Sequence, residues 1–164
     1  MRYKNRGSTP LEKFKLFNRK HNYLMGFTLI EVLFVTVILG ILTTLAIPQF
    51  LRSKMQANES AAIGSLKTLS TAMQSYSTSQ TPNGFAGASL AVLTAPAGGP
   101  PYIDELLGNG SKQGYNFNLI VTGPYVYTCQ ATPQVVGSTG IRVFRVTESG
   151  TVEVQNGGIW QAID

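Results

Sequence analysis

A long apolar run near the start of the chain dominates its hydrophobic pattern. Residues 27 to 47 form a run of 21 residues in which Glu31 is the only charged side chain. At about 1.5 Å per residue this run makes a helix of about 31 Å, which matches the hydrocarbon thickness of a bilayer. The run is too long for a secretory signal peptide, and no A-x-A cleavage site follows it. We therefore predict a retained membrane-spanning helix.

Beyond Pro48 the pattern becomes that of an amphipathic helix. Turn-forming residues at 81–84 predict that this helix ends near Ser79. Its apolar side chains recur at spacings of three, four and seven, while polar side chains fill the other face. These apolar residues are Met55, Ala62, Leu66, Leu69, Met73 and Tyr76. The two segments are interpreted as one long helix that is embedded in lipid at its start and packed on a small domain at its end.

The rest of the chain predicts a loop-rich middle followed by a small sheet. Residues 81–113 are rich in Gly, Pro, Ala and Ser, with a short apolar piece at 88–93 and a helical turn at 102–107. From Gly114 the apolar residues alternate, as in half-buried strands. The predicted strands are Tyr115 to Val121, Tyr125 to Ala131, Ile141 to Thr147 and Thr151 to Gln155. We expect an α+β fold in which an antiparallel sheet of about four strands covers the helix stripe.

Charge is concentrated before the apolar run. Residues 1–26 hold seven Lys and Arg residues against Glu12 alone, which is +6, whereas residues 27–164 hold six against seven acidic residues, which is −1. The positive-inside rule then places the N-terminus in the cytoplasm and residues 50–164 on the other side of the membrane. A nucleic-acid partner is not expected, because its basic surface should lie on the folded part.

The segment from Gly26 to Glu31, Gly-Phe-Thr-Leu-Ile-Glu, resembles the prepilin signature of type IV pilins and type II secretion pseudopilins. A basic leader and a spanning apolar helix accompany it, and the helix-then-sheet layout is similar to the pilin fold. The resemblance implies that prepilin peptidase cleaves after Gly26 and that the new amine on Phe27 is methylated. It also implies assembly on an inner-membrane platform by a cytoplasmic ATPase.

The resemblance divides the chain into three parts. Residues 1–26 are the leader, 27–49 the transmembrane and polymerisation helix, and 50–164 the amphipathic helix with its globular sheet domain. The subunit is expected in the bacterial inner membrane before assembly, and then in a filament at the cell surface or across the periplasm. Leu24 and Met25 precede the cleavage site where the family usually has a basic residue, so the subclass stays open.

The presence of Glu31 in the apolar run needs a physical explanation, because an unpaired carboxylate at mid-bilayer costs about 2.5 kcal/mol or more. Cleavage supplies one, since it exposes an amine on Phe27 that Glu31 of a neighbouring subunit can neutralise in the filament core. At about 4 Å and an effective dielectric near 20, the attraction is about 4 kcal/mol before desolvation. We therefore predict that this salt bridge sets the register of assembly. The alternative is a carboxylate that reaches the interface without a partner.

Gly40 and Pro48 lie where the family has helix-weakening residues. Proline removes one helical hydrogen bond and clashes with the carbonyl four residues back, here that of Thr44. The segment between them could therefore melt when the helix leaves the bilayer. A simple kink is the alternative.

The sequence offers no catalytic constellation, cofactor motif or metal site. His21, the only histidine, lies in the leader, and no Walker or Rossmann glycine pattern occurs. The carboxylates include no run of the EF-hand kind. Cys129 is the only cysteine and is interpreted as a buried structural thiol, with an intermolecular or reactive role as the alternative. Catalysis is therefore not expected.

The predicted function is that of a structural subunit of a type IV pilus-like filament, a homo-oligomer built through the apolar helix. One alternative keeps the superfamily and makes the chain a pseudopilin of a type II secretion system. The other is a membrane-anchored binding module that never polymerises. In that case a basic patch at Arg142 and Arg145 is where DNA would bind.

Overall fold

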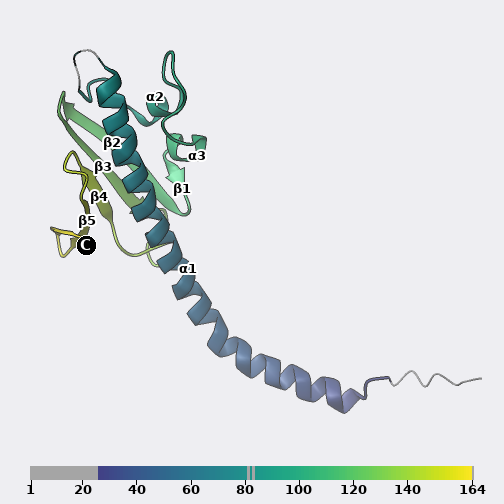
Figure 1. Cartoon of the computed structure of the whole chain (residues 1–164). Coiled ribbons are helices and arrows are strands. Elements are labelled where there is room, and N and C mark those ends of the chain that lie inside the picture. Colours follow the sequence, from purple (N-terminus) through teal and green to yellow (C-terminus); the bar gives the residue numbers. More distant parts are fainter. Residues whose placement is uncertain (1–25, 81, 83, 164) are drawn as a thin grey trace, which may run out of the picture. The chain divides into compact units, whose positions relative to one another are not determined.

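One helix forms most of the first half of the structure. The computed structural model describes residues 26–80, 82 and 84–163, and it divides into two units at Leu39 and Gly40. Helix α1, Leu29–Ser79, begins in the first unit and ends in the second (Figure 1). The end at Ser79 confirms the prediction from the turn-forming residues. The basic leader lies outside the described residues, apart from Gly26.

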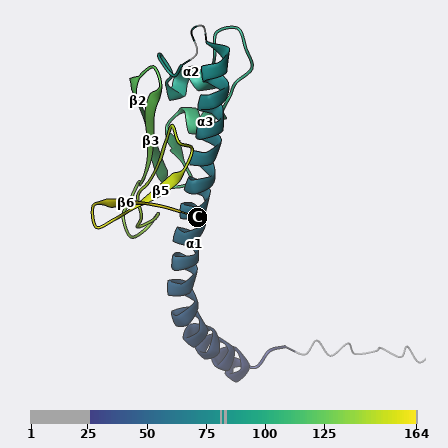
Figure 2. The same cartoon turned by 60° about the vertical axis from the view of Figure 1, so that its left-hand side comes forward.

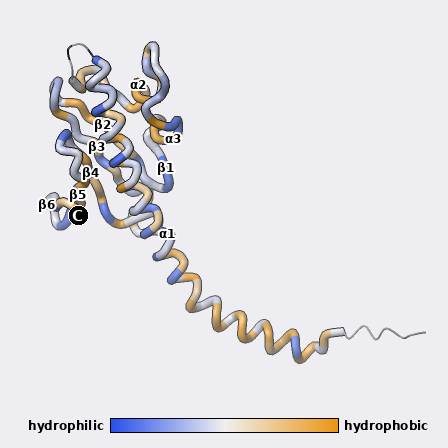
Figure 3. Tube along the Cα trace, viewed as in Figure 1, coloured by the Kyte–Doolittle hydropathy of each residue, from blue (hydrophilic) through white to orange (hydrophobic). Residues whose placement is uncertain are grey.

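The first part of α1 is apolar and uncovered. Every described residue from 26 to 54 is exposed, and the trace there is mostly hydrophobic (Figure 3). Among the described residues, α1 is the helix long and apolar enough to cross a membrane.

A six-stranded antiparallel sheet follows, with its strands in chain order (Figures 1 and 2). The strands are β1 (Ser111–Lys112), β2 (Tyr115–Gly123), β3 (Val126–Pro133), β4 (Phe144–Thr147), β5 (Val152–Asn156) and β6 (Ile159–Ala162). The prediction of about four strands was therefore too low. Both missed strands are edge strands: β1 has two residues, too few to show a period, and the four-residue β6 alternates weakly. The predicted third strand also begins at Phe144 rather than Ile141.

The core lies between the sheet and the second part of α1. Five of the six predicted stripe residues are buried, and Met55 is half-buried. Alternate residues of β2 to β5 pack against them: Tyr115, Phe117, Tyr127, Cys129, Ala131, Phe144, Val146, Val152 and Val154. The Tyr127 hydroxyl donates to Ser70 Oγ at 3.3 Å, which links β3 to the helix. Tyr125 was predicted to begin this strand, but β3 begins at Val126 and Tyr125 is 64% exposed.

Two short helices close the end of the core. Helix α2, Leu90–Thr94, and helix α3, Glu105–Gly108, each bury one leucine, Leu93 and Leu107. Ser89 caps α2 by accepting a hydrogen bond from the Val92 amide. The predicted apolar piece and helical turn correspond to these helices.

Candidate functional site

The N-terminal motif forms a capping box at the start of α1. The Glu31 Oε2 atom accepts hydrogen bonds from the Thr28 amide at 3.0 Å and the Thr28 hydroxyl at 2.9 Å. In return, the Glu31 amide donates to Thr28 Oγ1 at 3.3 Å. This Thr-x-x-Glu arrangement satisfies amides that lack a partner in the first turn, at the positive end of the helix dipole. The Thr-x-x-Glu spacing is visible in the sequence, but the cap was not predicted from it.

The two residues before the capping box are accessible. Gly26 has no heavy atom within 4 Å of the position that a Cβ would occupy, and Phe27 is 85% exposed. Neither residue belongs to α1, so a protease that binds this junction does not have to unwind a helix there. Cleavage and methylation here remain predictions.

Gly40 and Pro48 both lie inside α1. The helix is continuous through both positions, and no atom approaches the Cβ position of Gly40 within 4 Å. Pro48 supplies no amide hydrogen for the Thr44 carbonyl, while the Thr44 hydroxyl donates to the Ile41 carbonyl at 2.7 Å. Weakening of the helix at these two residues stays a prediction.

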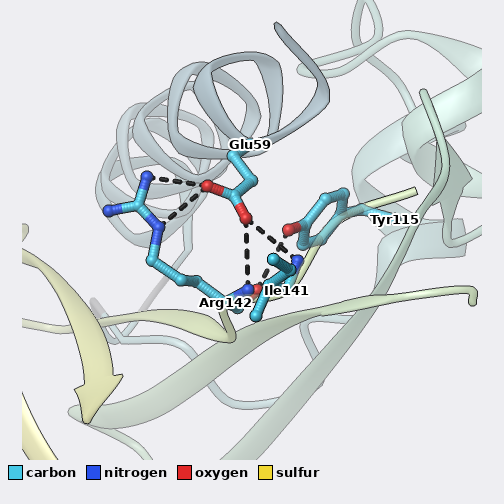
Figure 4. Close-up of polar contacts among 4 residues, drawn as sticks. All are labelled: Glu59, Tyr115, Ile141 and Arg142. Carbon is cyan, nitrogen blue, oxygen red and sulfur yellow. Dashed lines mark hydrogen bonds and ion pairs between the residues drawn. The ribbon is translucent and has the colours of Figure 1, made fainter. Parts of the chain in front are cut away.

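A second polar cluster connects α1 to the loop between β3 and β4, and Figure 4 shows it around Glu59. Only 6% of Glu59 is exposed. Its Oε1 atom accepts from the amides of Ile141 at 3.0 Å and Arg142 at 3.2 Å. Its Oε2 atom accepts from Arg142 Nε at 2.8 Å and lies 2.7 Å from Arg142 Nη2. The Tyr115 hydroxyl donates to the Arg142 carbonyl at 3.0 Å.

The electrostatics of this cluster favour the charged carboxylate. Burial opposes ionisation of Glu59, but the Ile141 amide and the Arg142 side chain and amide outweigh it and lower the pKa below its ordinary value. Burial, with the charge on Glu59, raises the pKa of Tyr115 to about 12. Both groups therefore hold their hydrogen bonds at neutral pH, and the cluster acts as a structural clamp.

This clamp was not predicted, although the sequence carries a signal for it. The apolar stripe has a spacing of seven between Met55 and Ala62, and Glu59 divides it into helical spacings of four and three. A carboxylate on the buried face of a helix requires partners. Its partners lie 82 and 83 residues later in the chain.

The remaining candidates for chemistry are structural as well. Cys129 is fully buried, and burial raises the pKa of its thiol to about 12, which agrees with the predicted structural role. Arg145 pairs with Glu153 and lies over the Trp160 ring. With Arg142 held by Glu59, the proposed basic patch is neutralised. Within residues 26–80, 82 and 84–163, no three His, Cys, Asp or Glu residues gather where they could hold a metal ion.

Comparison with known proteins decides the family. The chain is 35% identical over 115 residues to type II secretion system core protein G of Pseudomonas aeruginosa, a match that covers 65% of this chain and 75% of that protein. The chain belongs to the type IV pilin and type II secretion pseudopilin superfamily. The resemblance drawn from the segment Gly26 to Glu31 is thereby confirmed.

Two further relatives of this pilin-like chain match over shorter stretches. Type IV major pilin protein PilA of Myxococcus xanthus is 45% identical over 51 residues, which is 31% of this chain and 23% of the relative. Core protein G of Aeromonas hydrophila is 41% identical over 51 residues, a match that covers 31% of this chain and 36% of that protein. No protein-family model and no solved structure matches. The superfamily thus includes relatives named for a pilus and relatives named for a secretion system.

Proposed function

We propose that this chain is a prepilin, the structural subunit of a type IV pilus-like filament that assembles through the first part of α1. The observation that carries the proposal is an uncovered apolar helix joined to a domain whose own core is closed. The large apolar side chains between Phe27 and Leu51 are at least half exposed, whereas the stripe from Ala62 to Tyr76 is buried. An apolar surface of this length needs lipid before assembly and other copies of the helix afterwards.

Glu31 would set the axial offset between these copies. Both intrachain bonds that the carboxylate accepts in the described residues fall on Oε2, which leaves Oε1 for the amine of a neighbour's Phe27. The capping box also fixes the direction in which the carboxylate points. An amine buried without a counter-charge is penalised at every offset except the one that meets Glu31.

The proposal also specifies where the subunit is processed and where it is located. The subunit would reside in the bacterial inner membrane with its N-terminus in the cytoplasm, as the basic residues of the leader favour. A prepilin peptidase and N-methyltransferase would act at Gly26 and Phe27, and an inner-membrane platform would extract the subunit. The filament would then reach the cell surface or span the periplasm.

A pseudopilin of a type II secretion system is the second candidate, and the extent of one match favours it. The similarity to core protein G of P. aeruginosa covers most of that protein, whereas the pilin match covers 23% of its relative. The anchored binding module has less support, because the arginines that would bind DNA are both ion-paired.

Shearing of cells, electron microscopy of the sheared material and mass spectrometry of the subunit would test the proposal. We expect filaments whose subunit begins at an N-methylated Phe27. Protein found only in membranes, or a subunit that retains residues 1–26, would refute it. Deletion of the gene distinguishes the two candidate functions. Loss of surface fibres indicates a pilus, and retention of secreted proteins in the periplasm indicates a pseudopilus.

A further inference from the structure

The loop between β3 and β4, residues 134–143, holds apolar side chains toward solvent. Val135, Val136 and Ile141 are 57%, 73% and 63% exposed; we call these three residues the loop patch. An isolated exposed apolar residue is ordinary on a protein surface, but three on one short loop form a candidate contact surface.

The loop that carries the patch is internally braced. The Thr139 hydroxyl accepts from the Val135 amide at 3.1 Å, and the Thr139 amide donates to the Val135 carbonyl at 3.0 Å. The Gly137 amide donates to the Gly140 carbonyl at 2.9 Å. A Cβ on Gly140 would lie 2.1 Å from the Tyr115 hydroxyl, so the loop packs directly on β2. An ordered loop loses little conformational entropy when a partner docks on it.

The loop patch is also tied to α1. Asn58 Nδ2 donates to the Thr139 carbonyl at 2.9 Å, and the Glu59 clamp holds the amides of Ile141 and Arg142. Ile141 and Met55 line one surface hollow of about 590 Å³ with Arg52, Gln56, Glu59 and Arg142. Through Ile141 the patch therefore adjoins Met55, which lies one helical turn after Leu51 on α1. Phe50 and Leu51 are 68% and 52% exposed.

We propose that the loop patch docks on α1 of a second copy of this chain, at its exposed apolar stretch from Ile47 to Leu51. The inference rests on the proposed filament function and names a second contact for it. A patch that fits a different patch on an identical chain makes a heterologous contact, and such contacts generate open helical assemblies. This chain carries both halves of such a pair.

Charge argues for an apolar protein partner rather than a lipid surface. Residues 134–141 contain no charged side chain, and Arg142 is paired with Glu59. A loop that binds anionic lipid headgroups normally carries unpaired basic residues. The patch is also small relative to a stable dimer interface. It therefore supports registration of subunits that α1 has already brought together, and it does not drive association by itself.

The test uses the full-length chain in its own cells. Val136→Asp places an unpaired carboxylate in the proposed contact, and Leu106→Asp is the matched control, because Leu106 is 62% exposed on α3. Loss of one buried valine with desolvation of a charge should lower association at each contact by about tenfold or more. We expect the yield of sheared filaments to fall by at least that factor in Val136→Asp and to stay at wild-type level in Leu106→Asp. Both variants should show wild-type abundance and protease resistance in membranes.

A photoreactive benzoylphenylalanine at position 136 identifies the occupant. We expect, in assembled filaments, an adduct with a second copy that maps to α1 near residues 47–51, and none from the same probe at position 106. Normal filament yield in Val136→Asp, an adduct with lipid, or an adduct with another protein would overturn the docking proposal and leave the filament function standing. Absence of wild-type filaments would overturn both.

Discussion

Removal of the Glu59 carboxylate tests how much the clamp contributes to the fold. Glu59→Ala leaves the amides of Ile141 and Arg142 without their acceptor and the Arg142 guanidinium without its counter-charge. An unsatisfied buried donor costs about 1–3 kcal/mol, and breaking a fully buried ion pair costs about 3–5 kcal/mol. The Arg142 side chain is 50% exposed, so water recovers part of its loss. We expect a total destabilisation of about 2–4 kcal/mol.

Urea unfolding of the detergent-solubilised chain measures this loss. Trp160 is the only tryptophan and lies 4.2 Å from the Arg145 guanidinium, so its fluorescence reports on the sheet. With a slope of roughly 1–1.5 kcal/mol per molar urea for a domain of this size, the midpoint should fall by roughly 2 M. Asp104→Asn is the control, because its ion pair with Lys112 is exposed and contributes at most about 1 kcal/mol. Equal small effects of the two variants would show that the clamp is not a stabilising element.

The same clamp predicts a dependence of stability on pH. The folded-state pKa of Glu59 is lowered from its ordinary value of 4.5, so its stabilisation is present above that value and is lost as pH falls through the folded pKa. The difference in stability between wild type and Glu59→Gln should therefore shrink as the pH falls below about 4.5. A difference that stays constant from pH 7 to pH 3 would contradict the assigned ionisation.

Three further outcomes are expected. Glu31→Ala should leave membrane insertion intact but abolish or misalign filaments, as counted by microscopy after cleavage is confirmed; normal filaments would mean that apolar packing alone sets the register. A fragment of residues 50–164 should be monomeric by light scattering, and a tight oligomer would assign association to the globular domain instead. Gly140→Ala should destabilise the domain by about 1–3 kcal/mol in urea unfolding, because its Cβ would lie 2.1 Å from the Tyr115 hydroxyl oxygen and 2.7 and 2.8 Å from two carbons of that ring; wild-type stability would show that the ring can move aside.

The sequence by itself determined the features that arise within a short window of residues. The helix period fixed α1 as far as Ser79, the alternating period located the four central strands, and the segment from Gly26 to Glu31 identified the superfamily. Each of these signals is local, because the helix repeat, the strand repeat and the cleavage motif all extend over neighbouring positions. The same locality left the short edge strands β1 and β6 unpredicted.

Only the tertiary structure decided which side chains meet across the fold. Glu59 and Arg142 are 83 residues apart, and no periodicity in either segment indicates that the chain brings them together. Exposure of the loop patch is likewise a tertiary property. Val135 and Ile141 are residue types that usually lie in cores, but the bonds within the loop and its contacts with α1 and β2 leave both side chains exposed. A buried charge and an exposed apolar cluster are both the opposite of what the local hydrophobic pattern predicts. Their positions are set by partners that the chain supplies from elsewhere in its length.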